Sequence, residues 1–226
     1  YKGFEGDTVA SALLASGKKI FGRSFKYHRP RGVLTAGSEE PNALITVGQG
    51  AFQDPNIRAT TQEIFEGLIT KSQNNWPNLQ YDILSVNDLF SNFLGAGFYY
   101  KTFMWPKSFW EKIYEPFIRR AAGLGALSGL HNSDTYEKAY AFCDLLIIGG
   151  GPSGLMAAKI AAEAGLDVIL AEQEPIFGGR LNSETEKVDG IPGSDWAAKI
   201  IEELKELDNV RLYLRTTVTG VYDQGT

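Results

Sequence analysis

The amino-acid sequence predicts a two-domain protein of mixed α/β class, in which a small α+β domain precedes a domain built on a parallel sheet. In the first hundred residues, short runs rich in β-branched residues accompany a single helix pattern, which is typical of a small α+β domain. Residues 143–174 then read in order as strand, glycine turn, helix and strand, which is typical of a parallel sheet. We therefore expect a first domain at 1–90, an aromatic-rich connecting segment at 91–140 and a second domain at 141–226.

The composition is that of an ordinary globular protein and argues against several classes of partner. Of the 226 residues, 43% are hydrophobic and 22% are charged, and the formal net charge of −5 gives no reason to expect nucleic acid as a partner. No apolar run approaches the roughly 20 residues that span a bilayer, so no membrane partner is expected. The single cysteine, Cys143, excludes a disulfide framework and favours a reducing compartment, the cytoplasm.

The first domain is expected to begin with a short strand, a turn and a helix within residues 1–21. Asp7 or Thr8 is placed to accept the free N–H groups of the first helical turn, and Gly17 is placed to end the helix. Two further segments, bounded by Pro, Asn and Gly, are expected to be strands: residues 42–50 and 57–70.

The connecting segment is dominated by aromatic residues. Nine of the twenty residues at 98–117 are aromatic, and a helix is expected from Pro106 to Ala122. The rings either anchor this helix in a core or form a protein–protein interface, and the two interpretations are compatible.

No arrangement of residues in the sequence indicates a catalytic or metal site. The basic loop at 22–32 is expected to be solvated, or to contact an anion or another subunit. His28 lies in that loop and is one of only two histidines, neither of which has a partner at metal-ligand spacing. Cys143, at the entrance to a strand, is expected to be a buried and inert residue. We therefore expect neither catalytic residues nor a metal in this chain.

A glycine triplet follows the apolar run at 145–148, which is expected to be a parallel strand buried on both faces. Gly149 permits a tight turn, Gly151 lets a pyrophosphate approach the backbone, and Gly154 lets the following helix close on the strand. That helix, at 153–164, presents its free N–H groups to the phosphates. The order of strand, triplet, helix and strand predicts a dinucleotide site.

An acidic residue at the end of the second strand supports this interpretation. Glu172 lies 23 residues after Gly149, close to the spacing of about 20 expected for the acid that binds ribose hydroxyls. Its charge would repel a 2′-phosphate, and the following Gln173 and Glu174 offer no arginine to receive one, which argues against NADP. The fingerprint does not separate NAD from FAD, because both share the adenosine diphosphate half.

Three further segments complete the predicted second domain. The run FGGR at 177–180 adds a glycine pair and Arg180, which either reaches phosphate or ribose or is a solvated loop charge. Ser194 and Asp195 are expected to cap an amphipathic helix, and VRLYL to form a third strand. This order matches nucleotide domains of the flavin-disulfide-reductase type. The sequence lacks an initiator Met and stops where such a sheet needs further strands, so we expect a piece truncated at both ends.

The chain also resembles a known family. The stretches that carry the resemblance are RSFKYHRPRGVL, EEPNALITVG, PNIRATTQEIFEGLITKSQNNWP, AGFYYKTFMWP…FWEKIYEPFIRRAAGLG, CDLLIIGGGPSGL and RTTVTGVYD. They are similar to the α subunit of heterotetrameric sarcosine oxidase. The resemblance implies a ferredoxin-like (β-grasp) domain that has lost its [2Fe–2S] cluster, followed by a Rossmann-like dinucleotide-binding domain. Residues 1–142 contain no cysteine to ligate a cluster.

The resemblance further implies NAD in this chain, with FAD and covalent FMN mainly in a β subunit and zinc in a smaller subunit. Together with γ and δ subunits, the complex would oxidise sarcosine with O₂ to glycine and H₂O₂, and pass the one-carbon unit to tetrahydrofolate. It also places the Val218 backbone near the adenine. The residues expected to bind the cofactor are Gly149, Gly151, Pro152, Ser153, Gly154, Glu172, Gln173, Glu174, Gly179, Arg180 and Val218.

Two other functions remain open at this point. One is an FAD-binding subunit of a related amine dehydrogenase, opine dehydrogenase or hydrogen cyanide synthase complex. The other is a structural, non-catalytic subunit whose nucleotide only stabilises the fold.

Overall fold

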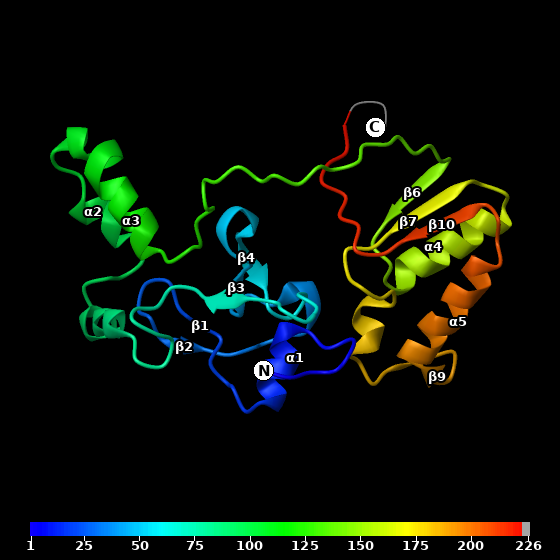
Figure 1. Ribbon diagram of the computed structural model, residues 1–226, viewed down its shortest axis with the longest axis horizontal. Coiled ribbons are helices and arrows are strands. Elements are labelled where there is room, and N and C mark those ends of the chain that lie inside the picture. The colour runs from blue at the N-terminus through cyan, green and yellow to red at the C-terminus, as the bar shows by residue number, and fades with distance from the viewer. Residues whose placement is uncertain (223–226) are drawn as a thin grey trace. The chain divides into compact units, whose positions relative to one another are not determined.

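The computed structural model describes residues 1–222, and the chain divides into two compact units, Tyr1–Thr135 and Tyr136–Thr226 (Figure 1). We refer to them as the first and the second unit. Both units mix helices and strands, as the sequence predicts. Up to residue 222, no helix combines the length and the apolar character needed to cross a membrane.

A three-stranded antiparallel sheet forms the centre of the first unit. β3 (Leu44–Val47) lies between β4 (Asp54–Arg58) and β5 (Thr70–Ser72), which confirms the strand predicted within 42–50. Short elements flank this sheet in the sequence: the paired strands β1 (Gly22–Arg23) and β2 (Pro30–Arg31), and the 3₁₀ turns η1 (Gly37–Glu39) and η2 (Gly50–Phe52).

The strand predicted at 57–70 is wrong for most of its length, because β4 already ends at Arg58. The next residues turn away from the sheet and meet the start of α1 (Val9–Ala15). There the carbonyl groups of Ala59 and Gln62 accept the first two N–H groups of α1, at 2.8 Å each. These tertiary hydrogen bonds replace the strand pairing that the β-branched composition suggested.

α1 begins and ends where the sequence predicts. The Thr8 side chain accepts a backbone N–H of the first turn at 3.2 Å, and Gly17 follows the last turn with a φ of +77°. The strand expected before α1 is absent from residues 1–6. Instead, the Asp7 carboxylate accepts the backbone N–H of Phe4 at 2.8 Å and closes a turn.

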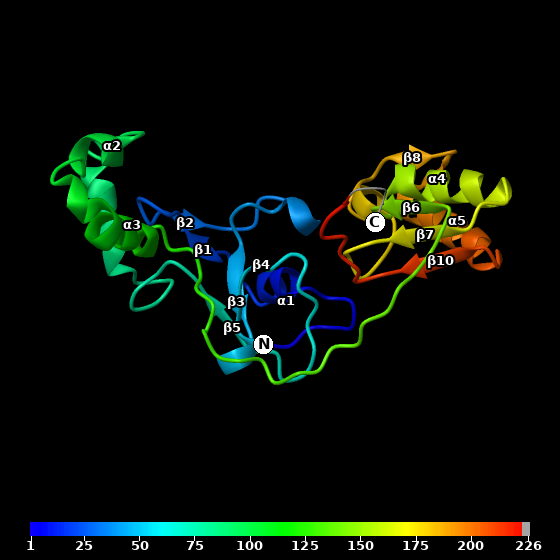
Figure 2. The same ribbon diagram turned by 90° about the horizontal axis from the view of Figure 1, so that it is seen from above.

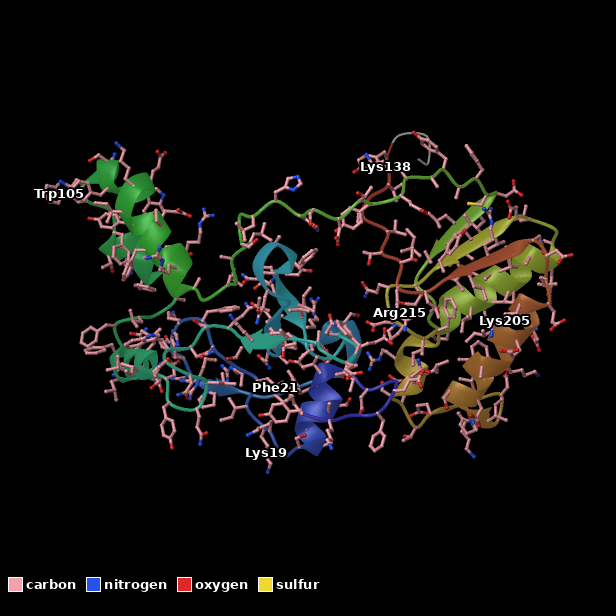
Figure 3. All side chains as sticks on the ribbon, viewed as in Figure 1. Lys19, Phe21, Trp105, Lys138, Lys205 and Arg215 are labelled. Carbon is pink, nitrogen blue, oxygen red and sulfur yellow. The ribbon has the colours of Figure 1, made fainter. Side chains whose placement is uncertain are left out.

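The core of the first unit lies between α1 and the sheet. Figure 3 labels Phe21, which is 3% exposed and packs in this core. The buried residues of the core are Val9, Ala10, Phe21, Ala43, Ile45 and Ala59.

A helical segment follows the sheet and carries the aromatic residues. The helix predicted at 106–122 is present as consecutive 3₁₀, π and α turns. Trp105 is 83% exposed and projects from the segment in Figure 3, and Phe117 is 67% exposed. The core interpretation is therefore wrong for these two rings within this chain. The elements of the segment are η3 (Ile83–Phe90), α2 (Phe98–Thr102), η4 (Lys107–Phe109), η5 (Trp110–Tyr114) and α3 (Glu115–Ala121).

The second unit is a parallel three-stranded sheet with helices packed on it, as Figure 2 shows from above. The strand order is β10-β7-β6, so the first strand of the unit lies at one edge of the described sheet and the last at the other. The elements are β6 (Leu145–Ile148), α4 (Pro152–Glu163), β7 (Val168–Ala171), η6 (Gly179–Asn182), β8 (Lys187–Val188), β9 (Ile191–Pro192), α5 (Gly193–Lys205) and β10 (Val210–Tyr213).

Burial differs between the central and the edge strand of this sheet. All four residues of β7 are buried, as expected for a parallel strand covered on both faces. In β6, however, Leu146 is 45% exposed and Ile148 is 58% exposed. The expectation that β6 is buried on both faces is wrong within the described residues. α4 packs against its other face, where Leu145 and Ile147 join the core of the unit.

α5 has the predicted amphipathic face but not the predicted cap. Ile200 and Leu204 are buried in the core of the unit. Ser194 and Asp195 lie inside the first turn and make no capping hydrogen bond, so the predicted cap is wrong. The helix starts directly after β9, and the Glu186 carbonyl accepts the N–H of the first helical residue at 3.2 Å. The hairpin formed by β8 and β9 thus satisfies a group that a side-chain cap would otherwise satisfy.

Candidate nucleotide site

The turn between β6 and α4 contains two glycines that the fold itself requires. Gly149 has a φ of +97°, a left-handed conformation that side chains disfavour. Its N–H donates to the Ala171 carbonyl at 2.8 Å and so fixes the turn to β7. A Cβ on Gly154 would overlap the Gly149 carbonyl oxygen, so α4 approaches the strand closely only because that side chain is absent.

Gly151 is different, because nothing in the folded chain requires a glycine there. Its φ of −72° and ψ of −176° are ordinary for any residue. A Cβ at this position would meet no atom within 4 Å, and it would project into open space. Gly151 is the N-cap residue of α4, which has no side-chain cap. Pro152 and the exposed Ser153 follow it in the first turn. The free N–H groups of that turn face a position suited to an anion.

Glu172, directly after β7, holds its carboxylate over the glycine turn. The residue is 6% exposed. One carboxylate oxygen accepts the Gly150 N–H at 2.6 Å, and the other accepts the Glu174 N–H at 2.9 Å. An ionised carboxylate offers about four lone-pair sites, so two remain for further donors such as ribose hydroxyls. The sequence predicted the placement of Glu172 beside the triplet, and the structure brings the two together.

The glycine pair after β7 folds back onto the same turn. The Gly178 N–H donates to the Gly150 carbonyl at 2.8 Å. A Cβ on Gly179 would lie 3.1 Å from the Gly151 Cα, so the two backbones approach closely at the open end of α4. The Phe177 ring is 7% exposed and occupies the space that a side chain on Gly150 would need. Sequence reasoning missed Phe177, although its position directly before the glycine pair was a usable signal.

The other residues predicted to bind the cofactor lie around this turn and differ in their contacts and exposure. The Arg180 guanidinium pairs with the Glu184 carboxylate at 2.7 Å, and the Arg180 side chain is 72% exposed. Gln173 is exposed. Val218 is half-buried in the segment after β10, two residues beyond Thr216, whose N–H donates to the Glu172 carbonyl at 2.8 Å. Figure 3 labels Arg215 at the start of that segment.

Two residues of the basic loop in the first unit, Arg23 and His28, make internal contacts, whereas Arg29 and Arg31 are exposed. The Arg23 guanidinium donates to the carbonyl groups of Leu79 and Gln80. His28, 2% exposed, contacts the buried Asp82 carboxylate through Nδ1 at 2.7 Å. The solvated interpretation is therefore wrong for Arg23 and His28. Within residues 1–222, no group of three or more His, Cys, Asp and Glu side chains is placed to hold a metal ion.

Two protein families match separate parts of the chain. Residues 1–75 match a family described as a 2Fe-2S iron-sulfur cluster binding domain. Residues 144–209, which contain the glycine turn and Glu172, match a family described as FAD dependent oxidoreductase. The two matches support the predicted order of a domain of the iron–sulfur type followed by an oxidoreductase domain of mixed α/β fold.

Known proteins match the chain over nearly its whole length. A sarcosine oxidase subunit alpha from Rhizobium meliloti is 58% identical over 98% of the chain, and one from Corynebacterium sp. is 33% identical over 97%. The chain spans only 22% and 18% of these relatives. A crystal structure of L-proline dehydrogenase from P. horikoshii has a similar fold, with a TM-score of 0.53 and 20% sequence identity. The match covers 99% of this chain and 33% of that chain, and it supports the fold alone. The resemblance inferred from the sequence is thus confirmed: over nearly its whole length, this chain is similar to sarcosine oxidase alpha subunits.

Proposed function

We propose that the second unit binds the adenosine diphosphate part of a dinucleotide at the glycine turn. The observation that carries this proposal is Gly151. Neither its backbone conformation nor any neighbouring atom requires a glycine, yet a side chain there would fill the space at the open end of α4. A pyrophosphate in that space would explain the residue.

The surrounding residues fit such a ligand. In this proposal, the pyrophosphate lies between Gly151 and Gly179, against the N–H groups that follow Pro152. Glu172 uses its two remaining acceptor sites for the hydroxyl groups of the adenosine ribose. The Val218 backbone lies near the adenine. Arg180 turns from Glu184 toward the phosphates or the second ribose.

We propose NAD as the dinucleotide, which is what the resemblance to the sarcosine oxidase α subunit implies. FAD is the second candidate, because residues 144–209 match a family described as FAD dependent oxidoreductase. The Glu172 carboxylate disfavours NADP through repulsion of a 2′-phosphate. When bound, a nicotinamide or flavin would supply redox chemistry, whereas the residues of this chain bind and orient it.

For the whole protein, we propose an oxidoreductase that acts on CH–NH donors. Its substrate would be sarcosine, with O₂ as oxidant, glycine and H₂O₂ as products, and tetrahydrofolate as acceptor of the one-carbon unit. The alpha-subunit relatives support a multi-subunit assembly, for which we propose β, γ and δ partners carrying FAD, FMN and zinc in the cytoplasm.

The cofactor is tested by its release from the full-length protein. Denaturation of the purified complex, followed by mass spectrometry of the supernatant, distinguishes NAD from FAD. Removing subunits before denaturation then shows which chain holds each cofactor. We expect NAD to remain with the chain that contains residues 144–209. Recovery of FAD alone from that chain would favour the dehydrogenase-type subunit, and recovery of neither would favour a structural subunit.

A further inference from the structure

A buried carboxylate lies at the centre of a loop in the first unit. Glu40 is 0% exposed, and its two carboxylate oxygens accept four backbone N–H groups. One oxygen accepts from Leu34 at 2.6 Å and from Thr35 at 2.7 Å. The other accepts from Asn42 at 2.7 Å and from Ala43 at 3.2 Å. The loop at 34–43 therefore closes around a single side chain.

The end of β4 and the two residues after it hold this loop in place from outside. The Ala59 N–H donates to the Ala43 carbonyl at 2.8 Å, and the Thr60 hydroxyl donates to the Gly37 carbonyl at 2.6 Å. Arg58 donates through Nε to the main-chain carbonyl of Glu40 at 3.1 Å. These bonds anchor the backbone of the loop at Gly37, Glu40 and Ala43, next to the N–H groups that the carboxylate accepts.

The negative charge of Glu40 is balanced by backbone dipoles. No ion pair to its carboxylate is found in the described part of the chain. Burial would raise the pKa of the Glu40 carboxyl, but the N–H donors of Thr35, Asn42, Leu34 and Ala43 together hold the pKa below its ordinary value. Converging backbone N–H groups of this kind form anion-binding concavities, which proteins use for phosphates and for iron–sulfur clusters.

The family match at 1–75 implies a [2Fe–2S] cluster that the residues do not fit. Such a cluster is held by thiolates, and residues 1–142 contain no cysteine. We propose that the loop at 34–43 is the anion site of the first unit and that the chain fills it with its own carboxylate, Glu40, rather than with a metal cluster. The site takes a small free carboxylate when the side chain is removed.

The test uses the full-length protein with Glu40→Ala, which removes four heavy atoms that match those of acetate. Hydrogen–deuterium exchange of peptides covering residues 33–44 reports the four N–H groups directly. We expect exchange at these amides to accelerate about tenfold or more, a fold-change typical of losing a charged hydrogen-bond acceptor. Sodium acetate should restore most of the protection, whereas sodium chloride at the same ionic strength should not.

Two variants serve as controls. Glu66→Ala removes an exposed carboxylate of the same unit and should leave the exchange of these peptides unchanged. Glu40→Gln keeps the shape but lacks the charge and turns an NH₂ group toward the donors, so its exchange should also accelerate. It also provides the measurement if Glu40→Ala does not fold.

Three results would overturn the proposal. Wild-type protection in Glu40→Gln would show that the loop does not need an anion. Equal recovery of Glu40→Ala in acetate and chloride would show that the cavity does not select a carboxylate. Stoichiometric iron and sulfide in this unit of anaerobically purified protein would show that a cluster binds after all. None of these outcomes depends on the nucleotide of the second unit.

Discussion

Each unit of this chain contains a buried glutamate that accepts backbone N–H groups, but the two sites differ in what they leave open. Glu40 accepts four N–H groups and is 0% exposed. Glu172 accepts two and is 6% exposed, beside open space at Gly151. A carboxylate has about four acceptor sites, so the first is saturated by the protein and the second is not. In our proposal, only the glutamate that keeps part of its hydrogen-bonding capacity contacts a ligand.

The largest expected effect is a loss of stability at Glu40, whose acceptor sites are all used by the protein. Glu40→Ala leaves four buried N–H groups without a partner and should lower the free energy of unfolding of the first unit by about 3 kcal/mol. Glu172→Ala leaves only two and should cost the second unit clearly less. Chemical denaturation of the full-length variants, monitored separately in peptides of each unit, measures both losses of unfolding free energy. Equal losses would remove the distinction between the two glutamates.

The next largest effect is on dinucleotide binding at the open space beside Gly151. Gly151→Val places a side chain in the space proposed for the pyrophosphate and should weaken dinucleotide binding by about a hundredfold, or about 2.7 kcal/mol. The unfolding free energy should hardly change, because a Cβ there meets no protein atom within 4 Å. Calorimetric titration with NAD and with FAD measures the affinity.

A matched control for this variant is Gly95→Val. Gly95 also has no atom within 4 Å of a Cβ, and it belongs to the first unit, whereas the glycine turn belongs to the second. The Gly95→Val variant should bind the dinucleotide as the wild type does. Unchanged affinity in Gly151→Val would show that the open space at α4 is not the pyrophosphate site.

A smaller loss of dinucleotide affinity is expected for Glu172→Ala. It removes the proposed hydrogen bonds to the ribose, each worth about 1.5–3 kcal/mol at most, and should weaken NAD binding roughly tenfold. Glu172→Gln should lose less, because one amide oxygen still accepts a hydroxyl. NADP binding should improve relative to NAD in Glu172→Ala, since the repelling charge is gone. A variant with wild-type NAD affinity would exclude a ribose contact.

The smallest effect is the pH dependence of the loop at 34–43. The pKa of Glu40 is lowered in the fold from the ordinary 4.5, so its stabilising contribution is fully present above about pH 4.5. The contribution is lost as pH falls through the folded pKa and the carboxyl takes a proton. Hydrogen exchange at 33–44, corrected for intrinsic rates, should show this loss in the wild type and not in Glu40→Gln. Protection that stays constant as the pH falls from 6 until the first unit unfolds would contradict it.

The sequence predicted those parts of the molecule that local pattern determines. Gly149 and Gly154 occupy the conformations that the triplet spacing requires, and Glu172 follows β7 as expected, because these features depend on residues within one β-α-β unit. Thr8 caps α1 for the same reason, since its partner is three residues away.

Elements whose hydrogen bonds come from distant residues were not predicted. β4 ends early because the following carbonyls meet α1, and α5 lacks its expected cap because the Glu186 carbonyl already accepts the first N–H. Glu40 follows another glutamate in the sequence and looks like part of a solvated acidic pair. Its burial becomes evident only when donors from both sides of the loop are seen to converge on it.

Arg23 has a consequence for how the first unit behaves when its backbone is cut. Its guanidinium joins the carbonyl groups of His28, Leu79 and Gln80, which bridges segments more than fifty residues apart in the sequence. A protease that cleaves an exposed loop between these segments would leave two pieces that the Arg23 side chain helps the sheet and the core to hold together. Nicked protein should therefore elute as an intact species in gel filtration. Arg23→Lys, which has one donor nitrogen in place of three, should hold the pieces less tightly.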